Sequence, residues 1–312
     1  MQTTLSQKTS FAGTGLHSGR PARVTLHPAP ADHGIVFRRS DFARIDGAAD
    51  PLIPALWDRV IVSPLNTRIE NAEGVSVSTI EHLMAALSGC GVHNVLVEID
   101  GPEVPILDGS AALFARGILS AGLAVLDAPL MAIEVLRPVS VTQGEATARL
   151  EPARKPGLTI DFEIDFADAA IGRQIRQIDM ANGAFLRELC DSRTFCRLQD
   201  VTAMQKNGLA LGGTVNNAVV VDGATVLTPG GLRHKDEAVR HKMLDSVGDM
   251  ATAGAPILGH YSGHRAGHAL TNALLRALFA EAGNWRLRPI DAGLARHLPG
   301  ADLRQEDLAA VA

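Results

Sequence analysis

A histidine and two carboxylates recur at helical spacing in the last quarter of the chain. His241 and Asp245 are four residues apart, so on a helix they share one face, and Asp249 lies on the same side one turn further along. An imidazole nitrogen and a carboxylate oxygen at this spacing can close on one cation. Catalytic zinc sites usually combine three such protein ligands with water. The alternative is an ordinary histidine–aspartate hydrogen bond on a helix surface, so the metal interpretation requires a third ligand from elsewhere.

His82 is the candidate third ligand. It lies in the first turn of a predicted helix, where the helix dipole disfavours the imidazolium and so favours the neutral imidazole that a metal needs. Its neighbour Glu81 points about 100° around the helix, so it is poorly placed to bind the same ion but could act as a base on a water beside it. Alternatively, Glu81 is a capping-box residue that accepts a hydrogen bond from the Ser78 amide. One carboxylate can hardly do both.

His268 follows Gly267 at the start of another predicted helix. A histidine in that position can face a cleft and donate a proton, or it can simply face solvent. Of the 11 histidines in the chain, His17 is predicted to be structural within a Gly-rich turn, and His234 to belong to a solvated basic loop. The others have no partner at a ligand spacing: His27, His33, His93, His260, His264 and His297.

Strands and helices alternate in both halves of the sequence, which predicts two α+β or α/β units that would position these residues. The segment Asp127-Ala128-Pro129 is the best domain boundary, because Pro129 precedes a fresh strand. The chain after Arg288 is expected to be a polar tail that is poorly ordered at its end. The predicted elements are a helix from near 78, a strand at 92–99, a helix at 111–121, strands at 131–136, 146–150 and 158–166, a helical segment around 185–190, a Gly-rich stretch at 208–221 that ends as a strand, and helices at 237–250 and 269–282.

The composition excludes several classes of function. The 312 residues are 46% hydrophobic and carry a formal net charge of −5, which argues for a globular chain of roughly two domains and against non-specific nucleic-acid binding. Only 4% of the residues are aromatic, which disfavours a stacking platform for single strands. The three cysteines form no CxxC pair, the N-terminus does not read as a signal peptide, and no apolar run reaches about 18 residues. A cytoplasmic protein is therefore expected.

Seven segments carry a resemblance to a known family. They are 13–19 (GTGLHSG), 79–87 (TIEHLMAAL), 104–111 (VPILDGSA), 191–195 (DSRTF), 208–213 (GLALGG), 239–245 (VRHKMLD) and 262–270 (SGHRAGHAL). In content, order and spacing they resemble the UDP-3-O-acyl-N-acetylglucosamine deacetylase family, the zinc enzymes of the lipid A pathway. The resemblance extends from about residue 8 to residue 280.

The resemblance implies that His82, His241 and Asp245 hold a Zn²⁺ ion and that Glu81 is the general base. Fe²⁺ could fill the same ligands. These implied roles suit amide hydrolysis, because zinc polarises a carbonyl and lowers the pKa of water while a carboxylate accepts the proton.

The resemblance also assigns roles around the metal. His268 is implied to be the general acid or electrostatic partner, with Asp249 orienting it and favouring its charged form. Lys242 and Thr194 are implied to contact the oxyanion or the substrate carbonyl.

The fold implied by the resemblance is α+β, with two similar α/β sandwich domains in which a sheet packs on helices and the active site lies between the domains. Applied to this chain, it implies a first domain at 1–127, a second at 128–290 and a polar tail at 291–312. A small insert near 193–221 is implied to build a hydrophobic passage for the acyl chain. Val215 stands where many members have an aromatic residue, so the passage wall is expected to be wider or reshaped there.

The activity implied by the resemblance is the removal of acetate from UDP-3-O-acyl-N-acetylglucosamine, the committed step of lipid A biosynthesis, by a monomer. The UDP-linked substrate is the expected partner, with no nucleic acid, no membrane span and at most transient contact with a membrane surface. Two alternatives stay open. One is a metal-dependent amidohydrolase that acts on another acylated sugar, and the other is a non-catalytic relative that holds a lipid in the passage.

Overall fold

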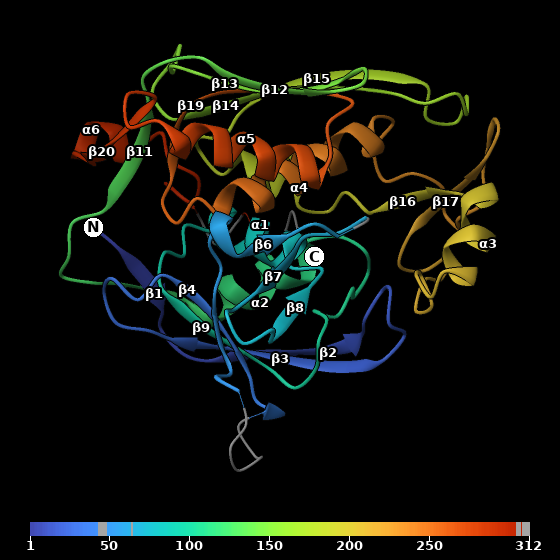
Figure 1. Cartoon of the computed structure of the whole chain (residues 1–312), viewed down its shortest axis with the longest axis horizontal. Helices are drawn as coiled ribbons and strands as arrows, with labels where there is room; N and C mark the ends of the chain where they lie inside the picture. The colour runs from blue at the N-terminus through green and yellow to red at the C-terminus, as the bar shows by residue number, and fades with distance from the viewer. Residues whose placement is uncertain (43–48, 64, 304–306, 308–312) are drawn as a thin grey trace.

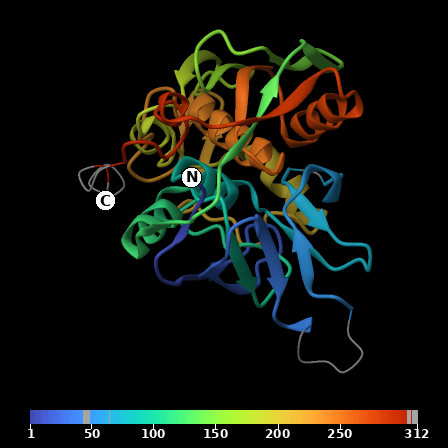
Figure 2. The ribbon, with the colours of Figure 1, turned by 90° about the vertical axis from the view of Figure 1, so that its left-hand side faces the viewer.

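The computed structural model describes residues 1–42, 49–63, 65–303 and 307. It is a mixed α+β structure in which several sheets pack on helices. In Figure 1 one large sheet lies below, a second lies above, and helices from both halves of the sequence lie between them. Figure 2 shows the same division from the side, with the blue-to-teal part of the chain below and the yellow-to-red part above. The chemistry-bearing helices therefore meet in the middle of the molecule.

The lower sheet has five strands in the order β2-β3-β9-β4-β5. Its strand β3 alternates buried and exposed residues, and Val24 and Leu26 on the buried face are fully covered. Smaller sheets pair β1 with β10 and join β6, β7 and β8. The bounds are Thr3–Leu5 (β1), Thr9–Thr14 (β2), Pro21–Pro28 (β3), Ile35–Arg39 (β4), Leu52–Pro54 (β5), Val60–Ile61 (β6), Arg68–Glu70 (β7), Ser76–Ser78 (β8), Val95–Ile99 (β9) and Leu123–Val125 (β10).

The upper sheet has seven strands and is centred on β19. This strand runs antiparallel to β13 and parallel to β14 and β11, and most of its residues are buried. Side chains of β14 that point inward, such as Ile160 and Phe162, form a core with the helices below. The bounds are Met131–Val135 (β11), Val139–Gln143 (β12), Ala146–Glu151 (β13), Leu158–Asp165 (β14), Arg173–Asp179 (β15), Ile257–His264 (β19) and Trp285–Pro289 (β20).

Four helices fill the space between the two sheets: α1 (Glu81–Gly89), α2 (Ala112–Ala121), α4 (Glu237–Ala251) and α5 (His268–Ala280). Helix α1 is buried at every position except Ser88, as expected for a helix that is apolar on nearly all sides. It packs against α4, which comes from the other half of the sequence. The predicted apolar stripe of α4, which includes Val239, Met243 and Val247, is confirmed as buried.

Gly248 lets α1 and α4 approach closely. A Cβ atom at this position would lie 2.0 Å from the backbone oxygen of Glu81, a distance that real Cβ atoms essentially never show. The two backbones therefore touch where α1 begins, next to His82 on α1 and three residues after Asp245 on α4. Any side chain at position 248 would push these two residues apart.

We expect Gly248→Ala to destabilise the protein by about 1–3 kcal/mol, because an added methyl group must displace backbone rather than a flexible side chain. Urea unfolding of the metal-free protein measures this loss. Gly267→Ala is the control, because its Cβ would meet nothing within 4 Å and its φ of −143° suits any residue. Equal stabilities for the two variants would contradict the close approach.

A small subdomain stands at the edge of the molecule, on the right of Figure 1. It consists of β16 (Phe195–Arg197), α3 (Leu198–Lys206), β17 (Val219–Asp222) and β18 (Thr225–Val226), and the three strands form one sheet. It overlaps the segment 193–221 in which the insert is expected. Three of its large aliphatic side chains are exposed: Leu198 (44%), Leu211 (53%) and Val215 (43%).

Most predicted elements are confirmed, with shifted ends. The helix expected from near Ser78 begins at Glu81, because Thr79 has a left-handed φ of 57° that no helix can contain. The strand expected at 92–99 is shorter, Val95–Ile99, and the helical segment near 185–190 is a π-helical turn at Phe185–Leu189.

The segment predicted as a polar tail is structured over much of its length. Helix α6 (Ala292–Ala295) is capped by Asp291, whose side chain accepts a hydrogen bond from the Leu294 amide. Leu294 and Leu298 are buried in a small cluster with residues of β11 and β19. The described part of the segment therefore packs on the upper sheet through apolar side chains that stand among polar ones. Residues 304–306 and 308–312 lie outside the described residues.

Within the described residues, no helix is both long enough and apolar enough to span a membrane.

Candidate metal centre

The structure brings His82, His241 and Asp245 together, all three of them buried. One ligand atom from each residue lies within 4.8 Å of the other two. Asp245 Oδ1 lies 3.3 Å from His241 Nε2 and 3.5 Å from His82 Nε2. The two imidazole rings are nearly perpendicular, at 88°, with centroids 5.0 Å apart. Helix spacing supplies the first two residues from α4, and the contact of α1 with α4 supplies the third.

The protonation states at this cluster suit a cation. Burial lowers the pKa of His241 to about 4, despite the opposing effect of Asp245, so the imidazole is neutral at neutral pH. Burial would raise the pKa of Asp245, but His241 and Lys242 hold it well below its usual range. Asp245 Oδ1 is buried and accepts no hydrogen bond from any described residue. A bound cation would satisfy this buried carboxylate oxygen and the two imidazole nitrogens that face it.

Glu81 is placed beside the cluster and does not cap its helix. Its Oε2 accepts a hydrogen bond from the backbone amide of Thr67, at 2.9 Å. The Ser78 amide instead donates to the carbonyl of Pro102, also at 2.9 Å, so the capping-box alternative is wrong. The reason is that Ser78 still belongs to strand β8. Burial raises the pKa of Glu81, although His268 and His82 act in the opposite direction.

His268 pairs with Asp249 rather than facing solvent. Its Nδ1 lies 2.9 Å from Asp249 Oδ2, and only 14% of its side chain is exposed. The Thr67 hydroxyl donates to Asp249 Oδ1 at 2.6 Å and so fixes the carboxylate. Burial alone would lower the pKa of His268, but Asp249 and Asp245 raise it to about 9. The Nε2 atom lies 3.9 Å from Asp245 Oδ2, so this protonated imidazole points at the cluster.

Lys242 and Thr194 lie in the same region, but Lys242 is held by a hydrogen bond of its side chain and Thr194 by hydrogen bonds of its backbone. Lys242 Nζ donates to Asp245 Oδ2 at 2.8 Å, and although burial opposes it, Asp245 raises the pKa of this ammonium group. The backbone of Thr194 is fixed at both ends, because its amide donates to Gly109 and its carbonyl accepts from Val219. Thr194 is half-buried, one residue before the small subdomain begins.

Sequence reasoning missed three groups around the cluster. Thr67 binds both Glu81 and Asp249, and the Ser192 carbonyl oxygen lies 3.0 Å from His241 Nδ1. His17, predicted to be only structural, has a buried Nε2 atom with no hydrogen-bond partner among the described residues. Burial lowers its pKa, Glu103 acts in the opposite direction, and His268 adds to the effect of burial. The Gly-rich run around His17 was a sequence feature that could have indicated a role for His17. A backbone contact such as that of Ser192 leaves no such feature in the sequence.

His234 lies in a loop whose neighbouring basic residues Arg233 and Lys235 are exposed, as predicted, but its own side chain is paired and partly buried. Its Nε2 is 2.9 Å from the carboxylate of Asp191, and the two side chains are about a quarter exposed. The reason is that this loop, which leads into the start of α4, folds back onto residues 191–193.

A cavity of about 380 Å³ lies away from the metal cluster. It is lined mainly by aliphatic side chains of both halves, including Ile35, Val92, Leu158, Val247 and Met250. It contains none of the candidate catalytic or ligand residues.

Comparison with known proteins gives one consistent answer. A model of the UDP-3-O-acyl N-acetylglycosamine deacetylase family matches residues 2–280. The UDP-3-O-acyl-N-acetylglucosamine deacetylase of Phenylobacterium zucineum is 47% identical over 294 residues, which cover 94% of this chain and 98% of that protein. The enzyme of the same name from Myxococcus xanthus is 47% identical over 260 residues, or 83% and 80% of the two chains. That from Actinobacillus pleuropneumoniae is 43% identical over 288 residues, or 91% and 92%.

Proposed function

Because the chain belongs to the UDP-3-O-acyl-N-acetylglucosamine deacetylase family, we propose that it is a zinc amidohydrolase that releases acetate from UDP-3-O-acyl-N-acetylglucosamine in lipid A biosynthesis. Water adds to the acetyl carbon, the carbon–nitrogen bond breaks, and acetate and the free amine of UDP-3-O-acyl-glucosamine leave. The observation that carries the proposal is the buried cluster of His82, His241 and Asp245, in which Asp245 Oδ1 accepts no hydrogen bond from any described residue.

Zn²⁺ fits the donor set, which offers two imidazole nitrogens and one carboxylate oxygen. When bound, the ion supplies Lewis acidity, which lowers the pKa of water and polarises an amide carbonyl. Lys242 neutralises the second oxygen of Asp245 and so leaves Oδ1 as the ligand atom. Fe²⁺ is compatible with the same donors, and metal analysis of purified protein distinguishes the two.

Glu81 is the proposed general base. Its Oε2 accepts a hydrogen bond from the Thr67 amide. Oε1 has no hydrogen-bond donor among the described residues and is available to the attacking water. Because it is adjacent to His82 in the sequence but turned about 100° around α1, it can accept a proton beside the ion without binding it.

His268 is the proposed general acid, and Asp249 orients it. The Nδ1 proton is directed at Asp249, so Nε2 carries the proton that faces the cluster and can pass to the leaving nitrogen. Asp249 is in turn fixed by the Thr67 hydroxyl. Thr67 therefore contacts both the proposed base, through its amide, and the partner of the proposed acid, through its hydroxyl.

We expect Asp249→Asn to lower kcat by about 10- to 100-fold with little change in KM, because the neutral amide no longer favours the imidazolium form of His268. Zinc content should stay the same, since Asp249 is not in the ligand set. Steady-state kinetics and metal analysis measure both quantities. Asp161→Asn is the control, because Asp161 also lies beside a histidine, 3.3 Å from His260, but outside the centre. An unchanged kcat for Asp249→Asn would contradict the role.

Lys242 and Thr194 are proposed to contact the oxyanion or the substrate carbonyl. Lys242 is a half-buried cation at the cluster, and a fixed positive charge there stabilises negative charge that develops on the carbonyl oxygen. Thr194 has a rigid backbone, so its hydroxyl starts from a defined position.

The small subdomain is proposed to hold the acyl chain. Its exposed Leu198, Leu211 and Val215 offer the apolar surface that a fatty acyl group requires.

We expect Val215→Phe to shift the preference towards shorter acyl chains, because a ring occupies more of the passage. Relative kcat/KM values for substrates of increasing acyl length test this, and an unchanged order would exclude Val215 from the passage wall.

The organisation expected from the resemblance completes the proposal. Residues 1–127 and 128–290 would form two similar sandwich domains, and the metal cluster would lie between them, since His82 belongs to the first and His241 to the second. We also propose that the protein acts as a monomer in the cytoplasm.

The proposal is tested by measuring zinc content and acetate release from UDP-3-O-acyl-N-acetylglucosamine on the same preparation. One tight zinc per chain with acetate release supports it. Zinc without acetate release would point instead to an amidohydrolase of another acylated sugar. Lipid binding with neither zinc nor turnover would identify a non-catalytic relative.

A further inference from the structure

We propose that the buried ion pair of Arg193 and Glu237 is a positioning device for the metal ligand His241. This inference rests on the proposed metal site. The pair acts through the backbone carbonyl of Ser192, which Arg193 follows directly in the chain. The argument has three steps, from the imidazole to the carbonyl and then to the ion pair.

The Ser192 carbonyl selects the tautomer of His241. Its oxygen lies 3.0 Å from His241 Nδ1, and a carbonyl can only accept a hydrogen bond. Nδ1 must therefore carry the proton, which leaves the lone pair on Nε2, the atom that faces Asp245 at 3.3 Å. In metal sites such a partner fixes both the tautomer and the direction of the ring.

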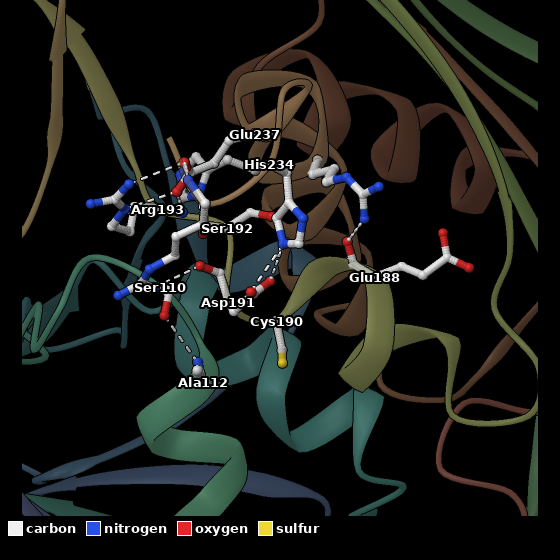
Figure 3. A network of polar contacts seen from close by, with 12 residues as sticks. Ser110, Ala112, Glu188, Cys190, Asp191, Ser192, Arg193, His234 and Glu237 are labelled. Carbon is white, nitrogen blue, oxygen red and sulfur yellow. Dashed lines mark hydrogen bonds and ion pairs between the residues drawn. The ribbon is translucent and has the colours of Figure 1, made fainter. Parts of the chain in front are cut away.

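The peptide that carries this carbonyl is held by Glu237. Glu237 Oε1 accepts hydrogen bonds from the backbone amide of Arg193 at 3.0 Å and from its Nε at 2.8 Å. Glu237 Oε2 accepts from Arg193 Nη2 at 3.1 Å and from the Arg233 amide at 2.7 Å. Arg193 Nη2 also donates to the carbonyl of Gly231, at 2.7 Å. Figure 3 shows Arg193 and Glu237 facing each other, with Ser192 next to them.

Glu237 is therefore connected to both partners of the His241–Ser192 hydrogen bond. Glu237 opens α4 and lies one turn before His241, so its backbone moves with the ligand's own helix. Its side chain binds the amide of Arg193, which belongs to the peptide unit that contains the Ser192 carbonyl. The acceptor is therefore tied to the helix that carries the donor.

The Arg193–Glu237 pair is buried, so a small change in either side chain should alter the local structure. Glu237 is 1% exposed and Arg193 is 7% exposed. Four donors converge on one carboxylate, and the planar guanidinium supplies two of them in a fixed geometry that a lysine cannot copy. A conservative change should therefore loosen the 191–194 turn without leaving a large hole.

The test uses Arg193→Lys and Glu237→Gln in the full chain, with zinc affinity measured by chelator competition. We expect each variant to bind zinc about 10- to 100-fold more weakly than the parent, the usual effect of losing a partner behind a metal ligand. The visible spectrum of the Co²⁺-substituted protein should change as well, because the imidazole direction changes. Neither readout depends on turnover.

Arg39→Lys is the matched control. Arg39 is also 7% exposed, makes two hydrogen bonds to one carboxylate, that of Asp41, and donates to a backbone carbonyl, that of Ser76. It lies in the first half of the chain, where it touches none of the ligand residues. We expect it to lose thermal stability comparably but to keep its zinc affinity within about twofold, which separates positioning from general destabilisation.

Two results would overturn the inference. One is an Arg193→Lys or Glu237→Gln protein with parental zinc affinity and an unchanged cobalt spectrum. The other is a nitrogen NMR spectrum of the metal-free parent in which His241 carries its proton on Nε2. If the parent itself binds no zinc, the proposed metal site fails instead, so the two failures are distinguishable.

Discussion

His241→Ala is expected to lose its zinc and its deacetylase activity together. His241 Nε2 is one of three ligand atoms around a small buried space, and its removal leaves one imidazole and one carboxylate. Catalytic zinc sites need three protein ligands to hold the ion while one position stays open. We expect metal analysis after dialysis to find little zinc, and kcat to fall by about 10³-fold or more, since the Lewis acid is lost. His82→Ala should behave in the same way, because His82 supplies the equivalent atom from α1.

His260→Ala is the matched control for this experiment. His260 is 2% exposed and its Nε2 lies 3.3 Å from a carboxylate oxygen of Asp161, which closely resembles the surroundings of His241. It lies on β19 and does not belong to the group of three candidate ligands. The control variant should lose stability but retain zinc. Full zinc occupancy with full activity in either His241→Ala or His82→Ala would disprove the assignment of the ligands.

Glu81→Gln is expected to keep its zinc and lose most of its turnover. The amide oxygen can still accept the hydrogen bond that Thr67 donates, so the local structure should persist. The amide cannot accept a proton from water, however, and the loss of a general base typically costs about 10²- to 10⁴-fold in rate. Steady-state kinetics and metal content, measured on one preparation, report the two properties separately.

Glu81→Ala separates catalysis from structure at the same position. It removes both the base and the acceptor for the Thr67 amide, so any additional loss of stability reports the structural part. Circular dichroism gives the folded fraction, to which the rate is normalised. Should Glu81→Gln retain parental kcat per folded molecule, the general base would have to be another group.

Local sequence patterns were most informative where chemistry and helical periodicity coincide. His241, Asp245 and Asp249 follow one another at intervals of four, and the structure places all three on the side of α4 that faces the cluster. The apolar positions between them, such as Met243 and Val247, were predicted by the same periodicity. Element ends were less well predicted, as at Thr79, because a single left-handed residue stops a helix that its sequence pattern would extend.

The sequence by itself therefore determined which side chains are candidates to bind a metal and to transfer protons, because residue type and helical spacing are local properties. Only the tertiary structure decided that His82 joins His241 and Asp245, because α1 reaches α4 through a contact that the bare backbone of Gly248 permits. It also decided that Glu81 binds Thr67 rather than capping α1, and that the Ser192 carbonyl lies beside Nδ1 of His241. These contacts join residues that are far apart in the chain. Several of them use backbone atoms, which every residue has, so a pattern of side chains does not predict them.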